Sequence, residues 1–383
     1  MKIGILTQPL HANYGGLLQA YALQTTLQKM GHDAIIINRE YSQYENPVDI
    51  PQSRVSKALD FIKYYIKVLV GRPAYLMVPR TKLHLLWRNA KEFLAKYYTI
   101  SPTLYTDKQL IDYYRSANFD CLIVGSDQVW RPAISPNIYN YFFDFAEEDN
   151  LKKLAYAASF GVNKWEFTEE QTYKCSRLAK LFDAISVRES SGVSLCKDYL
   201  GVEAYHVLDP TFLLEKEDYI EIINKEHEPI SDGSLYYYIL DSATSKMTLI
   251  KEIASKYQMK SYSCNFKGYE KCYRIGHFED SVYPPTTKWL RGFLDAKMVL
   301  TDSFHGAVFS IIFNKPFWVI GNKERGMARF ESLLGLFGLE DRLIDIENYE
   351  RVDFQMPIDW TGINNKKLAL KEASLAFLVY NLK

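Results

Sequence analysis

Short apolar runs alternate along the chain with longer segments in which apolar residues recur every three or four positions. In the first half, residues 2–6, 33–38 and 121–124 are apolar enough for fully buried strands, and residues 16–31 have helical spacing. A strand, a helix and a strand in succession predict a parallel sheet. The apolar segment 184–188 continues the alternation, so a doubly wound first half is expected.

A second alternation of strands and helices follows in the other half of the chain. Its predicted elements are 235–240, 244–259, 260–264, 286–296, 297–302 and 327–338. Two such halves predict two Rossmann-like parallel-sheet domains that face a cleft, at residues 1–203 and 204–345. The mostly helical segment 42–117 is expected to be an insertion in the first domain. The tail 346–383 contains an amphipathic helix, which we expect to pack back on that domain.

Charge and cysteine content narrow the choice of partners. The 46 basic and 46 acidic residues cancel, so the sequence predicts no nucleic-acid partner. Five cysteines without CxxC spacing indicate reduced thiols in a cytoplasmic protein, and neither they nor the carboxylates predict a metal site. The 29 tyrosines suit either strands or a surface that meets sugars.

One segment, residues 55–73, approaches the length and apolar character of a membrane span. Lys57, Asp60, Lys63 and Lys67 interrupt it, which indicates an amphipathic helix instead. We expect this helix to pack on its own domain, and the alternative is a peripheral contact with anionic lipid.

The turns that follow predicted strands are the candidate sites, because open parallel sheets bind ligands beyond the carboxyl ends of their strands. In the first such turn, Asn13, Tyr14, Gly15 and Gly16 lead into a helix N-terminus, where free N–H groups favour an anion or a sugar oxygen. The alternative is a glycine turn that serves tight packing. The turn lacks the GxGxxG and P-loop patterns, which disfavours a dinucleotide or ATP.

The second turn, "VGSDQVW", follows a buried strand. Ser126, Asp127 and Gln128 are suited to hold sugar hydroxyls, and Trp130 would offer a flat face for a sugar ring. The alternative is that Ser126 or Asp127 is only a helix N-cap.

The third turn begins with Arg188, at the end of a strand of small and apolar residues. A buried arginine needs an anionic partner. That partner is either the neighbouring Glu189 or the phosphate or carboxylate of a ligand, and we favour the ligand.

The fourth turn, "TDSFHG", places His305 between a strand and a buried helix, and Gly306 permits the sharp bend. Lys323, Arg325 and Arg329 follow the next strand. Together these residues predict an anion site on the second domain. If His305 acts on a ligand, the capping role is left to Asp302 or Ser303. From the residues alone, the best class is a transferase that binds an anionic donor on its second domain and a polar acceptor on its first.

The order of the four stretches resembles the polysaccharide pyruvyl transferase family. The motifs are "NYGGLLQAYAL", "VGSDQVW", "SVRE" and "TDSFHG" followed by "NKPFWVIGNKERG", and the likeness spans residues 1 to 340. It implies a glycosyltransferase-B-like fold and phosphoenolpyruvate as donor, with no separate cofactor. Pyruvate would become a ketal on two hydroxyls of a glycan sugar in surface or capsular polysaccharide biosynthesis. A lipid-linked acceptor would give the segment 55–73 a reason to touch a membrane.

The resemblance also implies roles for individual residues. His305 would be the general acid at the donor site, since imidazole titrates near neutrality, and Arg188 would bind the donor's phosphate or carboxylate. Ser303 stands where some members have an arginine, so we expect Lys323 or Arg325 to replace that cation. Asp127 would act as base toward an acceptor hydroxyl.

Two other function classes stay open at the level of the sequence. A nucleotide-sugar glycosyltransferase would need an acidic residue for the ribose, and Glu324 and Glu331 are candidates. A glycan-binding protein without catalysis would not need cations beside a histidine.

Overall fold

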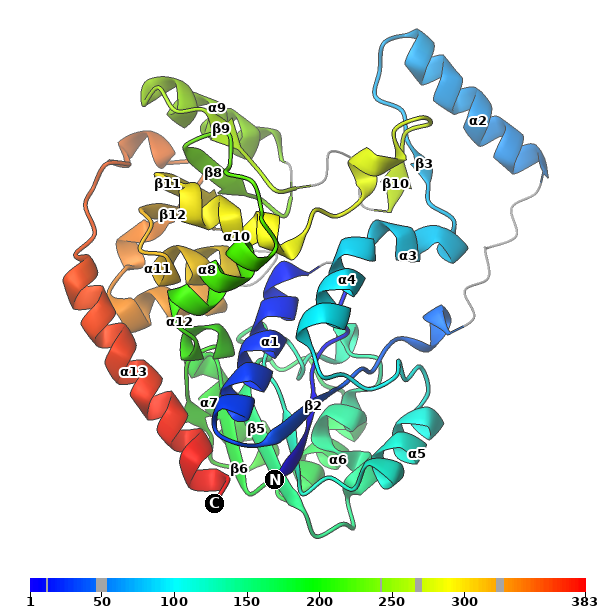
Figure 1. The fold of residues 1–383 in the computed structure, drawn as a ribbon, viewed down its shortest axis with the longest axis vertical. Coiled ribbons are helices and arrows are strands. Elements are labelled where there is room, and N and C mark those ends of the chain that lie inside the picture. The colour runs from blue at the N-terminus through cyan, green and yellow to red at the C-terminus, as the bar shows by residue number, and fades with distance from the viewer. Residues whose placement is uncertain (12, 46–53, 242, 266–270, 322–326) are drawn as a thin grey trace.

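Each half of the chain builds one parallel sheet, as predicted. The computed structural model describes the chain except residues 12, 46–53, 242, 266–270 and 322–326 and the side chains of 54–57 (Figure 1). The first sheet has the strand order β2 (Asp33–Ile37), β1 (Lys2–Leu6), β4 (Cys121–Val124), β5 (Lys152–Ala158), β6 (Ala184–Val187) and β7 (Tyr205–His206). All its neighbours pair in parallel. Its central strand β4 is apolar and buried at every position, as expected for a parallel sheet that helices cover.

The second sheet has the order β13 (Leu343–Ile344), β12 (Phe317–Ile320), β11 (Met298–Thr301), β8 (Leu235–Tyr238) and β9 (Ser261–Tyr262). It is also parallel throughout. The domain border differs from the predicted one, because β7 lies within 204–345 and yet pairs with β6 of the first sheet. The second domain therefore begins after β7.

The helices between the strands belong mostly to one domain each (Figure 1). Those of the first half are α1 (Tyr14–Lys29), α4 (Arg88–Tyr97), α5 (Asp107–Ala117), α6 (Glu169–Ala179) and α7 (Ser190–Leu195). Those of the second half are α8 (Lys216–Lys225), α9 (Thr244–Lys256), α10 (Thr286–Asp295), α11 (Phe304–Ile312) and α12 (Ala328–Phe337).

Two helices tie the domains together. The start of α1 enters the core of the second domain, where the Tyr14 ring stacks on Trp289 at 5.6 Å and its hydroxyl donates to the Pro284 carbonyl at 2.9 Å. The terminal helix α13 (Trp360–Asn381) returns to the first domain, and the Leu208 amide donates to Ser374 Oγ at 3.0 Å. The two domains are therefore joined by the packing of α1 and α13 as well as by the chain itself.

The insertion 42–117 reaches toward the second domain. Its strand β3 (Leu76–Met77) pairs antiparallel with β10 (Cys272–Tyr273), and its short helix α3 (Leu83–Leu86) lies beside this ribbon. The helix α2 (Arg54–Leu69) projects from the body (Figure 1). Among the described side chains of α2 only Tyr64 is buried, so the expected packing of this helix on its own domain is wrong. In the part of the chain that is described, no helix combines the length and apolar character needed to cross a membrane.

Candidate functional site

A cavity of about 230 Å³ lies where the carboxyl ends of the two sheets meet. Both domains line it. The lining residues are Asn13, Asp127, Gln128, Arg131, Leu240, Asp302, Ser303, Phe304, His305 and Arg329. The sequence placed six of these at the site, and the tertiary structure brings them together: Asn13, Asp127, Gln128, Ser303, His305 and Arg329.

A larger cavity of about 730 Å³ lies elsewhere, between α13 and the edge strand β7. Its lining includes Lys180, Asp183 and Glu203, which belong to the rim of the first domain. The buried charged side chains of Asp127, Asp302 and His305 instead line the cavity between the domains. We therefore place the candidate active site there.

His305 stands in the first turn of α11 and does not cap that helix. The cap is Ser303, whose Oγ accepts from the Gly306 amide at 3.4 Å. Gly306 is required at its position because an added Cβ would lie 2.1 Å from Thr301 Oγ1. His305 is 7% exposed, and its Nε2 lies 3.5 Å from Asp209 Oδ2. The imidazole thus has a carboxylate partner and lines the cavity.

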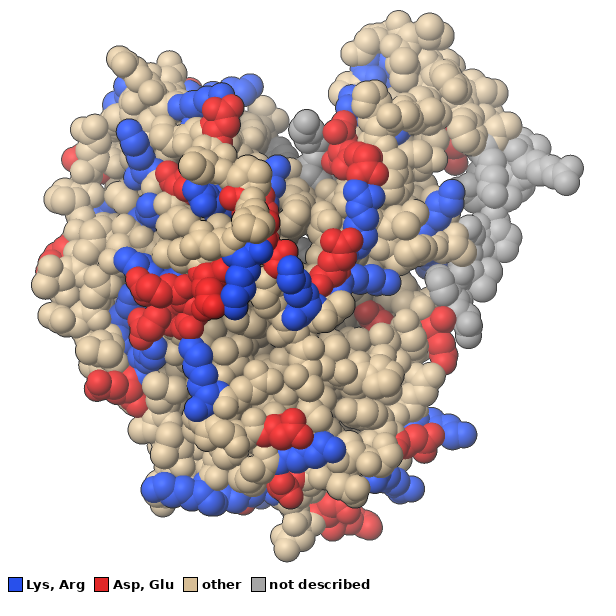
Figure 2. Space-filling view, in the orientation of Figure 1, with Lys and Arg blue, Asp and Glu red and all other residues tan. Residues whose placement is uncertain are grey.

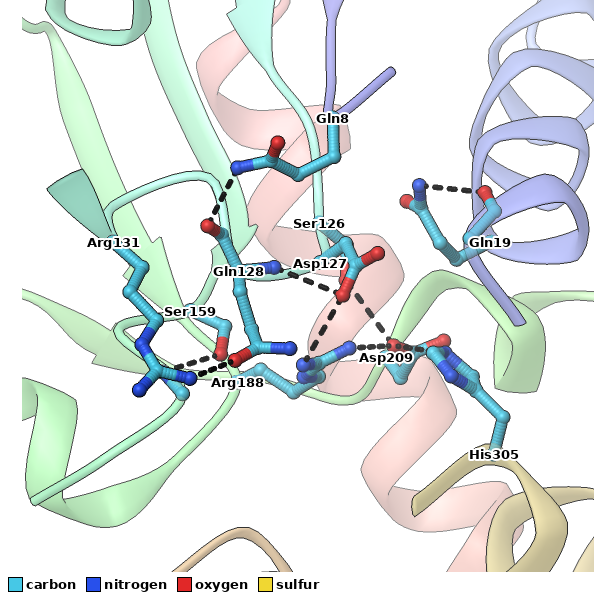
Figure 3. A network of polar contacts seen from close by, with 12 residues as sticks. Gln8, Gln19, Ser126, Asp127, Gln128, Arg131, Ser159, Arg188, Asp209 and His305 are labelled. Atoms are coloured by element: carbon cyan, nitrogen blue, oxygen red, sulfur yellow. Dashed lines mark hydrogen bonds and ion pairs between the residues drawn. The ribbon is translucent and has the colours of Figure 1, made fainter. Parts of the chain in front are cut away.

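Asp209 is the centre of the charged network in Figure 3. Its Oδ2 accepts from Arg188 Nη1 at 2.8 Å and from Ser126 Oγ at 3.1 Å, and Oδ1 accepts from the Thr211 amide at 3.0 Å and from Thr211 Oγ1 at 2.7 Å. Burial raises the pKa of Asp209, but His305 and Arg188 lower that pKa by a larger amount, so it lies well below the usual range. This carboxylate is therefore ionised beside His305.

Sequence reasoning missed Asp209. The available signal was an acidic residue within the otherwise apolar stretch "VLDPTFLL", directly after the last strand of the first sheet. A charged residue among buried apolar neighbours needs a partner, and here the partners are Arg188, which directly follows β6, and His305 of α11.

Arg188 lies directly behind the cavity wall, with its Nη2 4.0 Å from Asp127 Oδ1, and its predicted contact with a ligand stays a prediction. It is 3% exposed and is not among the residues that line the cavity. Besides its bond to Asp209, its Nε donates to Glu189 Oε1 at 3.2 Å, and its guanidinium carbon lies 4.4 Å from the centre of the Phe304 ring. Burial lowers the pKa of Arg188, but Glu189, Asp209 and Asp127 raise it above its ordinary value. Arg188 is thus a permanent cation, and carboxylates of the protein are its partners in this structure.

Asp127 joins the first two predicted turns. Its backbone is left-handed, with φ of 72°, which aims the carboxylate toward the N-terminus of α1. Oδ1 accepts from the Gln128 amide at 2.9 Å, and Oδ2 accepts from Asn13 Nδ2 at 3.3 Å. Asn13 also caps α1, since its Oδ1 accepts from the Gly16 amide at 3.2 Å. A carboxylate held by two donors and open to the cavity can accept a proton from a ligand.

Two arginines add positive charge to the cavity wall. Arg131 Nη1 donates to Gln128 Oε1 at 3.1 Å, and its Nε donates to Glu166 Oε2 at 2.9 Å. Burial and the nearby Arg188 lower the pKa of Arg329 to about 10, so Arg329 keeps its charge at neutral pH. The predicted donor residues Lys323 and Arg325 lie outside the described residues. In the described ranges, no group of three or more His, Cys, Asp or Glu residues is placed to hold a metal ion.

A comparison with protein-family models shows the family of this chain and its class of chemistry. The family model described as polysaccharide pyruvyl transferase matches residues 13–324, which is most of the chain. The chain belongs to the polysaccharide pyruvyl transferase family. Membership in this family indicates a transferase and implies a glycan acceptor. No curated protein matches the sequence.

Solved structures extend the comparison to the fold of this pyruvyl transferase family member. The UDP-GlcNAc 2-epimerase of Methanocaldococcus jannaschii superposes with a TM-score of 0.52 at 12% identity, over 99% of this chain and 100% of that chain. The UDP-GlcNAc 2-epimerase of Neisseria meningitidis gives 0.49 at 12% identity, over 100% and 99%. The glycotransferase of kitacinnamycin gives 0.47 at 12% identity, over 100% and 99%. The two parallel sheets and the likeness to the Methanocaldococcus jannaschii enzyme confirm the predicted glycosyltransferase-B-like architecture, and at 12% identity that likeness concerns the fold alone.

Several residues that were predicted to bind the acceptor of this pyruvyl transferase family member have other roles. Trp130 is fully buried, stacks on Phe142 at 5.0 Å and donates its Nε1–H to the Tyr141 carbonyl at 3.0 Å, so it offers no face to a sugar. Tyr14 is buried in the second domain. The Ser126 hydroxyl is fully buried and directed to Asp209.

The two glycines of the first turn serve close approach. A Cβ at Gly15 would lie 2.0 Å from His305 Nδ1, so Gly15 lets the first domain touch the histidine of the second. A Cβ at Gly16 would lie 3.0 Å from Asn13 Nδ2 and 3.2 Å from Asp127 Oδ2. The tight-packing alternative therefore accounts for both glycines in this structure.

Proposed function

We propose that this protein transfers pyruvate from phosphoenolpyruvate to two hydroxyls of a glycan sugar as a ketal, releases phosphate, and acts in the cytoplasmic synthesis of a surface or capsular polysaccharide. Family membership supports the transferase class and the glycan acceptor. The observation that carries the donor assignment is the inter-domain cavity, where His305 and two arginines face a small space. Phosphoenolpyruvate is a compact anion with a phosphate and a carboxylate, which suits arginine forks.

The size of the cavity favours this donor over a nucleotide sugar. About 230 Å³ is less than the roughly 300–1,000 Å³ of sites that enclose drug-sized ligands. Glu331, one of the two candidates for holding a ribose, is exposed on α12 and does not line the cavity, and Glu324 lies outside the described residues. The free state of all five cysteines fits a reducing compartment.

The proposed chemistry begins with a proton transfer. His305 gives a proton to the methylene carbon of the donor, and the electrons of the double bond form the new C–H bond. The adjacent carbon becomes an oxocarbenium-like centre, which the first sugar hydroxyl attacks while Asp127 takes its proton. The C–O bond to phosphate then breaks, the second hydroxyl attacks, and its proton leaves with the phosphate. The proton on Asp127 balances the one that His305 has lost.

Asp209 has a positioning role in this scheme. Its carboxylate is fixed by Arg188, Ser126 and Thr211, so the charge opposite His305 does not move during the reaction. A fixed carboxylate stabilises the imidazolium that donates the proton and holds the ring in one orientation.

Phosphorus NMR of the purified protein tests the proposal. With phosphoenolpyruvate and candidate glycans we expect inorganic phosphate. With a sugar nucleotide, release of nucleoside diphosphate would indicate glycosyl transfer instead. No change in either mixture, across a panel of glycans, would indicate binding without catalysis.

His305→Ala separates chemistry from folding. We expect phosphate release to fall by about 10²–10⁴-fold, the usual contribution of a general acid, with an unchanged far-UV circular dichroism spectrum. The control is His84→Ala, which should leave the rate of phosphate release unchanged because His84 is exposed on α3. A His305→Ala enzyme that turns over at the wild-type rate would show that the acid is another residue.

A further inference from the structure

The projecting helix α2 contacts the body of the protein through one side. Tyr64 is 8% exposed, and its hydroxyl accepts a hydrogen bond from the Ile275 amide at 3.0 Å. This contact with the β10 region defines the side of α2 that faces the protein. The other described side chains of the helix are exposed or, for Asp60, half-buried.

An apolar stripe runs along the opposite side of α2. It consists of Leu59, Ile62, Ile66 and Leu69, which are 47%, 54%, 54% and 84% exposed. Their spacing of three, four and three residues puts them on one face, and at 3.6 residues per turn Tyr64 lies half a turn away from the centre of that face. The stripe therefore points away from the protein, and on the face seen in Figure 2 the projecting lobe is largely uncharged.

The charges beside the stripe are basic. Lys63 and Lys67 lie next to it on the helix surface, and residues 54–72 contain five basic residues and one acidic residue, a net charge of +4. The whole chain is neutral, so this segment concentrates positive charge where apolar side chains are exposed. An amphipathic helix of this kind binds in the interface of an anionic bilayer. Pairing of α2 with a second copy would bring like charges together, which disfavours a dimer through this face.

We propose that α2 docks on an anionic bilayer surface, with Leu59, Ile62, Ile66 and Leu69 buried among the lipids and the lysines at the headgroups. The docking does not depend on the proposed reaction. If that reaction is correct, docking brings the cavity to glycans that are carried on lipids.

Vesicle flotation of the full-length protein without substrates tests the docking. At 0.15 M salt we expect flotation with vesicles of phosphatidylcholine and phosphatidylglycerol, and little with phosphatidylcholine alone. Lys63→Gln/Lys67→Gln should lower the partition coefficient about 30-fold, since each basic residue near the surface contributes about fivefold. Ile62→Glu/Ile66→Glu should abolish flotation.

Two matched controls change similar residues elsewhere. Leu368→Glu/Val379→Glu alters apolar side chains on α13 that are 54% and 47% exposed, and Lys180→Gln/Lys197→Gln removes two exposed lysines of the first domain. Both should float like the wild type, with unchanged circular dichroism for all variants.

Three results would overturn the proposal. The first is no flotation of the wild type with anionic vesicles, and the second is equal flotation of Ile62→Glu/Ile66→Glu. The third is a wild-type dimer in analytical ultracentrifugation that this same variant converts to a monomer, because the stripe would then be covered by a second copy.

Discussion

Gly15 is the position at which the first domain touches the histidine of the second. An added Cβ there would lie 2.0 Å from His305 Nδ1 and 2.2 Å from Cγ, whereas real Cβ atoms essentially never lie closer than 3.0 Å to another heavy atom. Gly15→Ala therefore demands a shift of at least about 1 Å. The imidazole cannot yield freely, since Phe304 and Asp209 flank it.

The shift can occur in two ways, and both damage the site. Either the imidazole turns away from Asp209, or the domains separate at the cavity. A misplacement of about 1 Å costs on the order of 100-fold in rate, or about 2.7 kcal/mol of transition-state stabilisation. Alanine is favoured over glycine in a helix by up to about 1 kcal/mol, so α1 itself is not weakened.

The assay is the rate of phosphate release from phosphoenolpyruvate at saturating glycan, with circular dichroism to monitor folding. The matched control is Gly335→Ala in α12, where an added Cβ would meet only Glu340 Oε1 at 3.6 Å. We expect a loss of at least about 100-fold for Gly15→Ala and none for Gly335→Ala. Wild-type activity in Gly15→Ala, or an equal loss in the control, would refute the reasoning.

Three further predictions concern the buried network and the aromatic core. Burial raises the pKa of Asp209, but its ion pairs lower that pKa by more, so the carboxylate contributes stability that is complete above pH ~4 and lost as the pH falls. Asp209→Asn should flatten this acid-induced loss of unfolding free energy in urea titrations, and an unchanged pH profile would contradict the prediction. Arg188→Ala leaves buried carboxylates unpaired and should cost about 3–5 kcal/mol of unfolding free energy; weaker donor binding in calorimetry at unchanged stability would instead favour a direct ligand contact. Trp130→Ala should lower the unfolding free energy by about 3–5 kcal/mol in the same titrations and leave the KM for the glycan unaltered. A raised KM at wild-type stability would instead indicate that Trp130 stacks on a sugar ring.

Much of the fold could be predicted from the sequence because its signals are local. The strands 2–6 and 121–124 were located to the residue, since fully buried parallel strands are continuous apolar runs between polar turns. The domain border was less well predicted, because β7 has only two residues and its pairing partner, not its own pattern, makes it a strand. The position of α2 was predicted well, but not its exposure, because an amphipathic pattern is the same whether a helix packs on protein or on lipid.

The candidate site divides in a similar way. The pattern of apolar runs shows which turns follow strands, and it thereby selects His305, Asp127 and Asn13 for one edge of the fold. The pairing of Arg188 with Asp209, the burial of Trp130 and the contact of Gly15 with His305 became visible only in the folded chain. The physical reason is that a residue type states what a side chain can bond to, whereas its actual partner depends on elements that come from distant parts of the chain and meet only when the two domains close on each other.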